Sequence, residues 1–435
     1  MALLLVYSFC YTICLNPVII INEVGQYNIL NAIGDIGSKM KKIISFFIAF
    51  VLVLGVCVVQ CPISHAEETG NSDVAIESRS AILIEAHSGQ VIYEKNADEK
   101  LRPASVTKIM TLLLIFEELE KGTITYDDIV TVSAHAASMG GSQCFFEEGE
   151  QQTVRDMIKC IEVASGNDAA TAMAEHISGS EEAFVNLMNQ RASELGMVNT
   201  HFENACGLEA EGHVTSARDI AIMSKELICN HPDIYEFSTI WMDYIIHRTR
   251  RGESRFDLAN TNKFLKSYTG ATGLKTGYTS QAKYCMSATA NRNGIELIAV
   301  IMGADTKEIR NKEAGKLLDY GFARCSIYSD TEGIPADTVF PVKFGESKQV
   351  TPKPIDNFQL VIVDASPEMV EKRVIPAENL NAPVLEGDTI GMIQYMVDGK
   401  VISEVFIYAA EDVDKSTYKN YFKKLCRKLF LLSPI

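Results

Sequence analysis

A hydroxyl and an amine lie three residues apart in the segment Ser105-Val106-Thr107-Lys108. On a helix, residues at this spacing share one face and lie one turn apart. A lysine can take the proton of a serine if the amine is neutral, and burial or a nearby cation favours the neutral form. The helix N-terminus also stabilises negative charge that develops near the serine. The spacing therefore predicts nucleophilic catalysis by Ser105, with Lys108 as its base.

The bare S-x-x-K pattern is weak evidence, because it also occurs at 38–41, 280–283 and 416–419. Only Ser105 follows a predicted hairpin and opens a predicted helix whose interior is apolar on most sides. Such a helix is expected to be buried rather than packed on one face. Context therefore selects Ser105 from the four matches.

Two further polar motifs follow in order along the chain. Ser165-Gly166-Asn167 lies in a predicted loop between helices, and Lys275-Thr276-Gly277 lies on a predicted strand. A glycine at the end of that strand lets a substrate backbone lie close alongside. Lysine and threonine beside it can bind a carboxylate. The ordered set of three motifs is much more specific than any one of them.

The elements that must position these motifs can be predicted from local signals. Apolar runs bounded by turn residues predict strands, and capping residues with Gly stops predict helix ends. The predicted strands are 80–86, 90–93, 273–279, 283–290 and 295–303; the predicted helices are 105–121, 153–163, 168–177, 180–196 and 307–320. Helices enclosed between early and late strands predict an α+β catalytic domain over 75–326, in which a mixed sheet carries a helical subdomain.

The composition and local pattern of the sequence change after about residue 327. Short β-rich runs alternate with Pro, Gly and Asp or Asn at 340–344, 358–363, 389–397 and 401–408. This pattern predicts a small all-β domain over 330–410.

The last twenty residues, 416–435, alternate aromatic or leucine side chains with five basic residues and contain no acidic one. The helical spacing predicts an amphipathic helix that lies on an anionic membrane surface. The alternative is a solvated helix packed on its own protein.

The N-terminal segment contains the three regions of a signal peptide in their usual order. A positive start at Met40-Lys41-Lys42 precedes an apolar run over 43–59, and Ser64-His65-Ala66 supplies small residues at a cleavage site. We expect translation to start at Met40 and cleavage after Ala66, so that 1–66 is an extension plus signal peptide and the main body is exported. A single membrane anchor is the alternative.

Composition narrows the class of function. The chain has 435 residues and a net charge of −16, which disfavours a nucleic-acid binder. Its eight histidines contain no H-E-x-x-H, and its eleven cysteines contain no C-x-x-C. The sequence therefore predicts neither a metal site nor a cofactor.

The ordered triple S-x-x-K, S-x-N and K-T-G resembles the set shared by penicillin-binding proteins and active-site serine β-lactamases. The segments 146–150, 164–169, 212–219 and 273–277 look like those of low-molecular-mass D-alanyl-D-alanine carboxypeptidases, within them most like the type-5 and sporulation-associated family. The resemblance spans about 75–435. It implies a penicillin-binding fold, a β-rich domain, a peptidoglycan stem pentapeptide as substrate and covalent inhibition by β-lactams.

The resemblance also implies roles for individual residues. Ser105 would attack the carbonyl between the two terminal D-alanines to form an acyl-enzyme, and Lys108 would take its proton. Ser165 would relay a proton to the leaving amine, and Asn167 would orient Lys108 and the substrate.

The carboxylate site and the oxyanion hole follow from the same resemblance. Lys275, Thr276 and Gly277 would hold the terminal carboxylate, with Arg218 as a further candidate or, equally, a structural ion pair. The backbone N–H groups of Ser105 and Tyr278 would form the oxyanion hole.

Three other functions stay open at this point. A serine β-lactamase shares the acylation machinery, but no E-x-x-L-N motif lies between Asn167 and Lys275. A non-catalytic cell-wall-binding scaffold would not need both nucleophile and base. An endopeptidase acting on cross-links would use the same residues.

Overall fold

The structure is a computed structural model that describes residues 74–355 and 357–429. The predicted signal peptide, with its start at Met40 and its cleavage site after Ala66, lies outside the described residues. So does the end of the predicted membrane helix, 430–435.

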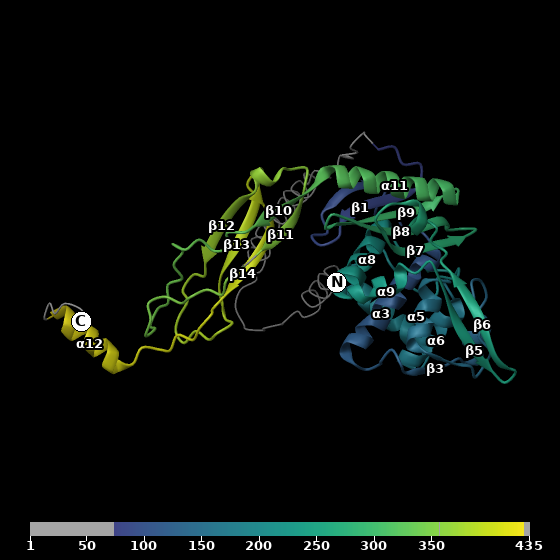
Figure 1. Ribbon diagram of the computed structural model, residues 1–435, viewed down its shortest axis with the longest axis horizontal. Coiled ribbons are helices and arrows are strands. Elements are labelled where there is room, and N and C mark those ends of the chain that lie inside the picture. The colour runs from purple at the N-terminus through teal and green to yellow at the C-terminus, as the bar shows by residue number, and fades with distance from the viewer. Residues whose placement is uncertain (1–73, 356, 430–435) are drawn as a thin grey trace, which may run out of the picture. The chain divides into compact units, whose positions relative to one another are not determined.

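The catalytic region is built on a five-stranded sheet with the order β2-β1-β9-β8-β7 (Figure 1). Its strands are β1 (Ser80–Glu85), β2 (Val91–Lys95), β7 (Ala271–Thr279), β8 (Lys283–Arg292) and β9 (Ile295–Ala304). All four pairings are antiparallel. Strand β1 pairs with β9 through Ser80 and Met302, so strands from the two ends of the region close the sheet around the helices between them.

Helices cover both faces of this sheet. Alternate residues of β9 point to opposite sides: Ile298 and Val300 belong to the core shared with α8 (Ala217–Asn230). Leu297 and Ala299 belong to the core shared with α11 (Lys307–Arg324). Figure 1 shows α11 and α8 on the two sides of the strands. A strand covered on both faces is apolar along most of its length, as β9 is from Leu297 to Met302.

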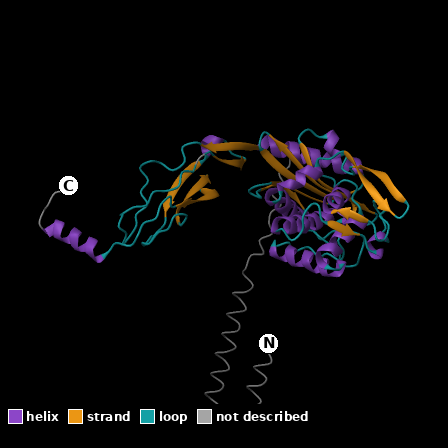
Figure 2. Ribbon diagram, turned by 60° about the horizontal axis from the view of Figure 1, so that its bottom comes forward, coloured by secondary structure: helices purple, strands orange, loops and turns teal. Residues whose placement is uncertain are grey.

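The remaining helices of the region gather beside the sheet (Figure 2). Among them, α3 (Lys108–Lys121) is buried from Lys108 to Phe116, as its apolar sequence predicts. The predicted N-caps are confirmed, because Thr153 accepts the N–H of Asp156 and Ser180 accepts the N–H of Ala183. The others are α4 (Ala134–Ala137), α5 (Val154–Glu162), α6 (Asn167–Ser178), α7 (Glu181–Glu194), α9 (Tyr235–Ser238) and α10 (Phe264–Ser267), with 3-10 turns at Ala104–Thr107 (η1) and Pro232–Ile234 (η2).

Two small antiparallel sheets were not predicted. Strand β3 (Ile129–Thr131) pairs with β4 (Gln151–Thr153), and β5 (Met242–Thr249) pairs with β6 (Gly252–Ala259). Strand β6 is exposed along most of its length and reads GESRFDLA. A strand with so little apolar alternation has no local signal that separates it from a loop.

The β-rich region contains a pair and a three-stranded sheet. Strand β10 (Cys325–Asp330) pairs with β11 (Phe358–Val363), and β13 (Thr389–Val397) lies between β12 (Glu371–Pro376) and β14 (Lys400–Tyr408). A 3-10 turn, η3, covers Pro367–Met369. The predicted strand 340–344 is wrong: Pro341 and Lys343 make only isolated bridges there. Proline has no N–H to donate, so a ladder cannot continue through it.

The described chain ends in α12 (Tyr418–Leu429). Within 74–355 and 357–429, none of the helices has the length and apolar character needed to cross a bilayer.

Candidate active site

The predicted nucleophile lies in the 3-10 turn η1, directly before α3. Lys108, the first residue of α3, is therefore one turn further along the same face. The predicted helix began at Ser105, and the structure replaces its first turn with this tighter one. The side chain of Ser105 is only partly exposed, at the surface of an otherwise buried segment.

A buried histidine holds this turn. The N–H of Glu203 donates to Nδ1 of His213 over 3.0 Å, so the ring proton is on Nε2. Nε2 then donates to the hydroxyl of Thr107 over 2.8 Å, and this hydroxyl donates to the carbonyl of Ala104 over 2.9 Å. Burial lowers the pKa of His213 to about 4, so the ring is neutral near pH 7. The chain of contacts fixes the backbone on both sides of Ser105.

The amine of Lys108 has three oxygen neighbours. Its Nζ lies 2.6 Å from Oδ1 of Asn167, 2.7 Å from the carbonyl of Cys206 and 3.2 Å from Oγ of Ser105. A neutral amine has two N–H groups and one lone pair. The two carbonyl oxygens can only accept, so they take the N–H groups and turn the lone pair toward the Ser105 hydroxyl.

Electrostatics favour that neutral amine. Lys108 is fully buried, and burial, aided by the charge of Lys275, lowers its pKa to about 7. A base whose pKa is close to the working pH combines the correct protonation state with a useful driving force for proton transfer.

The S-x-N motif lies where α5 leads into α6. Ser165 has a φ of 60°, and its buried hydroxyl has no hydrogen-bond partner among the described residues. The side-chain N–H of Asn167 donates to the carbonyl of Gly140 over 2.6 Å, which leaves its oxygen for Lys108. The structure thus brings Asn167 together with Ser105 and Lys108.

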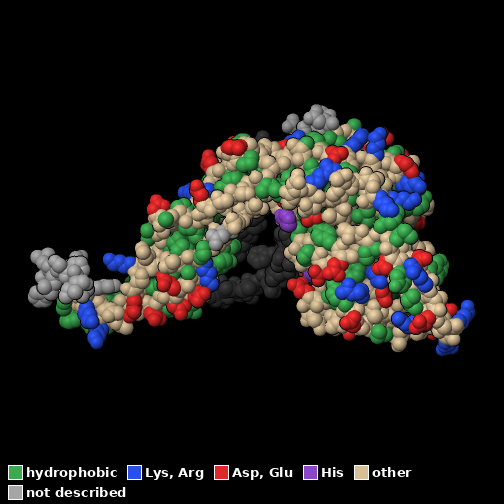
Figure 3. Space-filling view, viewed as in Figure 1, with side chains coloured by type: hydrophobic (Ala, Val, Ile, Leu, Met, Phe, Trp, Pro, Cys, Tyr) green, Lys and Arg blue, Asp and Glu red, His purple; other side chains and the backbone are tan. Residues whose placement is uncertain are grey.

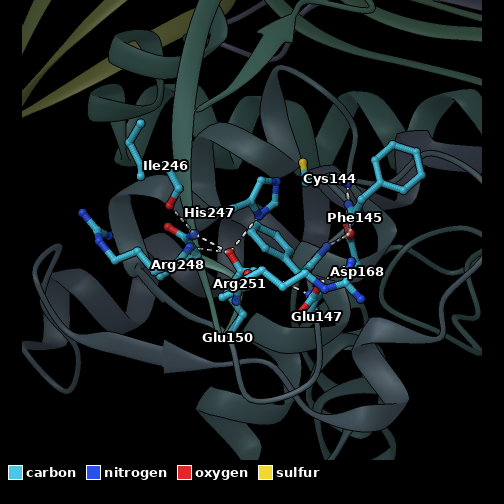
Figure 4. A network of polar contacts seen from close by, with 12 residues as sticks. Cys144, Phe145, Glu147, Glu150, Asp168, Ile246, His247, Arg248 and Arg251 are labelled. Atoms are coloured by element: carbon cyan, nitrogen blue, oxygen red, sulfur yellow. Dashed lines mark hydrogen bonds and ion pairs between the residues drawn. The ribbon is translucent and has the colours of Figure 1, made fainter. Parts of the chain in front are cut away.

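A loop on the far side of this motif is anchored by two buried carboxylates (Figure 4). Asp168 accepts the N–H groups of Cys144 and Phe145 over 2.9 and 2.8 Å. Glu150 accepts from Nδ1 of His247 on β5 over 2.8 Å. The loop that supplies Gly140 is therefore fastened to both α6 and the β5–β6 hairpin.

The K-T-G motif lies on β7, the last strand of the five-stranded sheet. Lys275 is 1% exposed, and its Nζ has no hydrogen-bond partner in the part of the chain that the structure describes. A Cβ on Gly277 would lie 3.0 Å from the backbone nitrogen of Ser105 and 2.9 Å from the carbonyl of Pro103. Only glycine lets this strand lie so close to the nucleophile. Tyr278 follows it, with a side chain that is half exposed.

Arg218 is not brought together with these residues. Its guanidinium pairs with Asp98 over 2.8 Å and with Glu94 over 2.5 Å. The structure therefore favours an ion-pair role for Arg218.

Two groups close to these motifs have no local signal in the sequence. One is the backbone carbonyl of Cys206, since any residue could supply it. The other is Arg310 on α11, a buried cation whose guanidinium bonds to Asn311 and, over 3.5 Å, to the carbonyl of Cys285. Its charge lowers the pKa of Lys275, which places it within electrostatic reach of the K-T-G strand. In sequence it looks like an ordinary solvated helix residue.

No cluster of three or more His, Cys, Asp or Glu in the described part of the chain is arranged to hold a metal ion. The groups that do converge are a serine hydroxyl, a lysine amine whose pKa is lowered to about 7, an amide oxygen that accepts from this amine, and a buried lysine on β7. This arrangement suits acyl transfer through a covalent serine intermediate.

Comparison with known proteins points to the same chemistry. A family model described as D-alanyl-D-alanine carboxypeptidase matches residues 66–306, and a model of the penicillin-binding protein 5 C-terminal domain matches 328–415.

Individual relatives agree with these matches. The chain is 41% identical to the D-alanyl-D-alanine carboxypeptidase DacF of Bacillus subtilis over 392 residues, which cover 88% of this chain and 98% of the relative. It is 32% identical to DacA of Escherichia coli, covering 80% of this chain and 86% of the relative.

The fold has solved counterparts. The structure of penicillin-binding protein 5 from Haemophilus influenzae matches with a TM-score of 0.66 and 31% identity, covering 79% of this chain and 99% of that one. These relatives do not favour the β-lactamase alternative. The chain has the penicillin-binding α+β fold with a C-terminal β domain, and it belongs to the serine-type D-alanyl-D-alanine carboxypeptidase family of low-molecular-mass penicillin-binding proteins.

Proposed function

We propose that this hydrolase removes the terminal D-alanine from peptidoglycan stem pentapeptides through an acyl-enzyme on Ser105. The observation that carries the proposal is the position of the Lys108 amine. It is held by Asn167 and the carbonyl of Cys206, and it lies 3.2 Å from the Ser105 hydroxyl.

Acylation begins when Oγ of Ser105 attacks the carbonyl between the two D-alanines and its proton passes to Nζ of Lys108. The negative oxygen of the tetrahedral intermediate is received by the backbone N–H groups of Ser105 and Tyr278, each worth roughly 3 kcal/mol. The C–N bond then breaks. The hydroxyl of Ser165 gives a proton to the leaving amine and recovers one from Lys108.

Deacylation reverses these roles. Water attacks the ester carbon and gives its proton to Lys108, which is neutral again after acylation. The bond to Oγ of Ser105 breaks, and the hydroxyl recovers that proton. The net result is one peptide bond hydrolysed, with the shortened peptide and free D-alanine as products.

In this proposal, the cations at β7 bind the terminal carboxylate of the substrate. Lys275 and Thr276 face it directly, and Gly277 lets the substrate backbone lie along the edge of the strand. Arg310 is a better second cation than Arg218. Arg218 already pairs with Glu94 and Asp98, whereas the hydrogen bonds found for Arg310 go to an amide and a carbonyl.

β-Lactams present a carboxylate and a reactive carbonyl in the same relation as the terminal dipeptide. We therefore expect penicillin to acylate Ser105 and to block the site. Substrate and inhibitor share one nucleophile, so one substitution tests both.

We also propose that the protein is exported and works at the outer face of the cytoplasmic membrane, with 416–435 lying on anionic lipid. On the described part of α12, Phe422, Leu425 and Leu429 are exposed although they are apolar. Figure 3 shows hydrophobic and basic side chains next to each other on this helix. Exposed apolar side chains next to positively charged ones are typical of a helix that lies at a membrane interface.

The test is the intact mass of the protein during incubation with penicillin G, followed by release of D-alanine from a pentapeptide. We expect a lasting single adduct in the wild type and none in Ser105→Ala. Ser88→Ala, a serine on the β1–β2 turn, is the control and should acylate normally. Destroyed penicillin without a lasting adduct would indicate a β-lactamase. A folded protein with neither adduct nor turnover would leave only a scaffold role.

A further inference from the structure

Glu162 is a buried carboxyl group that the mechanism above does not use. It is the last residue of α5, three positions before Ser165, and it is 1% exposed. Neither of its carboxyl oxygens has a hydrogen-bond partner among the described residues. An unpaired charge in a protein interior is costly, so a buried carboxylate requires a nearby cation.

Lys275, whose Nζ is likewise buried and without a hydrogen-bond partner among the described residues, is the cation whose charge acts on Glu162. The backbone N–H of Thr261 donates to the carbonyl of Val163, the residue after Glu162, over 3.1 Å. The hydroxyl of Thr276, the residue after Lys275, donates to the hydroxyl of Thr261 over 3.3 Å. One residue of a third segment therefore ties the end of α5 to the K-T-G strand.

The charges of the two residues act on each other. Burial raises the pKa of Glu162, and the positive charge of Lys275 opposes that rise. Burial lowers the pKa of Lys275, Glu162 opposes that fall and Arg310 adds to it. From α3, the remaining charged group is Lys108, whose own pKa is lowered by Lys275.

We propose that Glu162 is a positioning residue whose carboxylate keeps Lys275 protonated, and thereby maintains the cation that receives the substrate's terminal carboxylate. The inference rests on the proposed function, in which Lys275 binds that group. With Lys108 neutral as the base, Lys275 and Arg310 are the buried cations available to the substrate carboxylate, and Glu162 is the carboxyl group that acts on Lys275.

Removing the carboxylate leaves two buried cations without a counter-charge. In Glu162→Gln, which keeps the shape of the side chain, Lys275 should lose its proton at a lower pH. We measure kcat/KM against pH with an acylated peptide that ends in D-Ala-D-Ala. The alkaline limb, the pH at which kcat/KM falls as the pH rises, should lie lower than in the wild type by about one unit or more. The change should appear mainly in KM, because Lys275 binds a carboxylate that is charged in the ground state as well as in the transition state.

Three variants separate charge from structure. In Glu162→Asp and Glu162→Asn the new side chains have nearly equal size. The difference between the pH profiles of these two variants therefore reports the effect of the charge alone. We expect Asn to move the alkaline limb and Asp to leave it near the wild-type position. Glu85→Gln is the matched control, because Glu85 is also 1% exposed but accepts from N–H groups of its own turn, His87 and Ser88. It should lower the melting temperature without moving the limb.

The inference is overturned if Glu162→Gln keeps the wild-type alkaline limb, or if Glu162→Asp moves it as far as Glu162→Asn does. If Glu162→Gln does not fold, the Asp and Asn pair decides the question alone. Failure of the proposed function has a different signature: the wild type would then show neither penicillin adduct on Ser105 nor release of D-alanine.

Discussion

Nζ of Lys108 lies 2.6 Å from Oδ1 of Asn167, although 59 residues separate the two in sequence. The amide of Asn167 is itself held by the carbonyl of Gly140, so its oxygen can only point toward the lysine. Together with the carbonyl of Cys206, this contact selects the lone-pair direction of a neutral amine. Under the proposed mechanism, acylation therefore depends on the protonation state of Lys108.

The first prediction follows from that contact. Asn167→Asp places a carboxylate against Nζ of Lys108, which stabilises the ammonium form and raises a pKa that is about 7 in the native site. Since the neutral amine is the active form, the acid limb of penicillin acylation should move to higher pH by about one unit or more. The measurement is the acylation rate against pH by intact mass.

A matched control makes the same substitution, Asn to Asp, at a position outside the site. Asn291→Asp alters an exposed asparagine near the end of β8 whose oxygen accepts the N–H of Gly294, which an aspartate can also do. It should leave the limb unchanged. If the acid limb of Asn167→Asp lies at the same pH as that of the wild type, the assignment of Lys108 as the base is contradicted.

The second prediction concerns the approach of β7 to the nucleophile. In Gly277→Ala, a Cβ would lie 2.9 Å from the carbonyl of Pro103 and 3.0 Å from the nitrogen of Ser105, so strand and turn must separate. A displacement of this kind should reduce acylation by about 100-fold. Gly315→Ala is the control, because its Cβ would make only an ordinary contact, 3.6 Å from the ring of Tyr268. Equal acylation rates in both variants would show that the close approach is not required.

The third prediction is a loss of stability in acid caused by His213. Its folded pKa is about 4, below the ordinary value of 6.5, so the unfolded chain takes up a proton first as the pH falls. The contribution of this residue is therefore fully present above pH 6.5 and is lost between 6.5 and 4, amounting to at most about 3 kcal/mol.

Urea unfolding at pH 7 and pH 4.5 measures this loss. In His213→Gln the stability at pH 7 should be lower, because the contacts to Thr107 and Glu203 change, but its dependence on pH over this window should be weaker. An unchanged dependence would assign the acid sensitivity to other groups.

The fourth prediction tests the membrane helix. Protein that ends at Lys415 should no longer pellet with vesicles rich in phosphatidylglycerol, whereas the full chain should. Binding by the full chain should weaken as salt is added, since the positive charges of α12 are screened. Zwitterionic vesicles are the control and should bind both forms poorly. Full pelleting of the shortened protein would reject this role for 416–435.

Local patterns were sufficient for much of the fold. The caps at Thr153 and Ser180 and the buried character of α3 follow from interactions within a few residues, which the sequence displays directly. The β5–β6 hairpin was missed because β6 is exposed and polar, so its pairing depends on its neighbour strand. The segment 340–344 has apolar residues, but a proline prevents it from continuing a ladder.

The sequence by itself determined the order of the three motifs and the helical spacing that sets Ser105 beside Lys108. Only the tertiary structure decided which remote groups act on the two lysines: the carbonyl of Cys206 contacts Lys108, and the charges of Glu162 and Arg310 act on Lys275. It also decided that Arg218 pairs with Glu94 and Asp98. The physical reason is that spacing along one helix is a local property, whereas the electrostatic environment of a buried amine depends on every segment that folds against it.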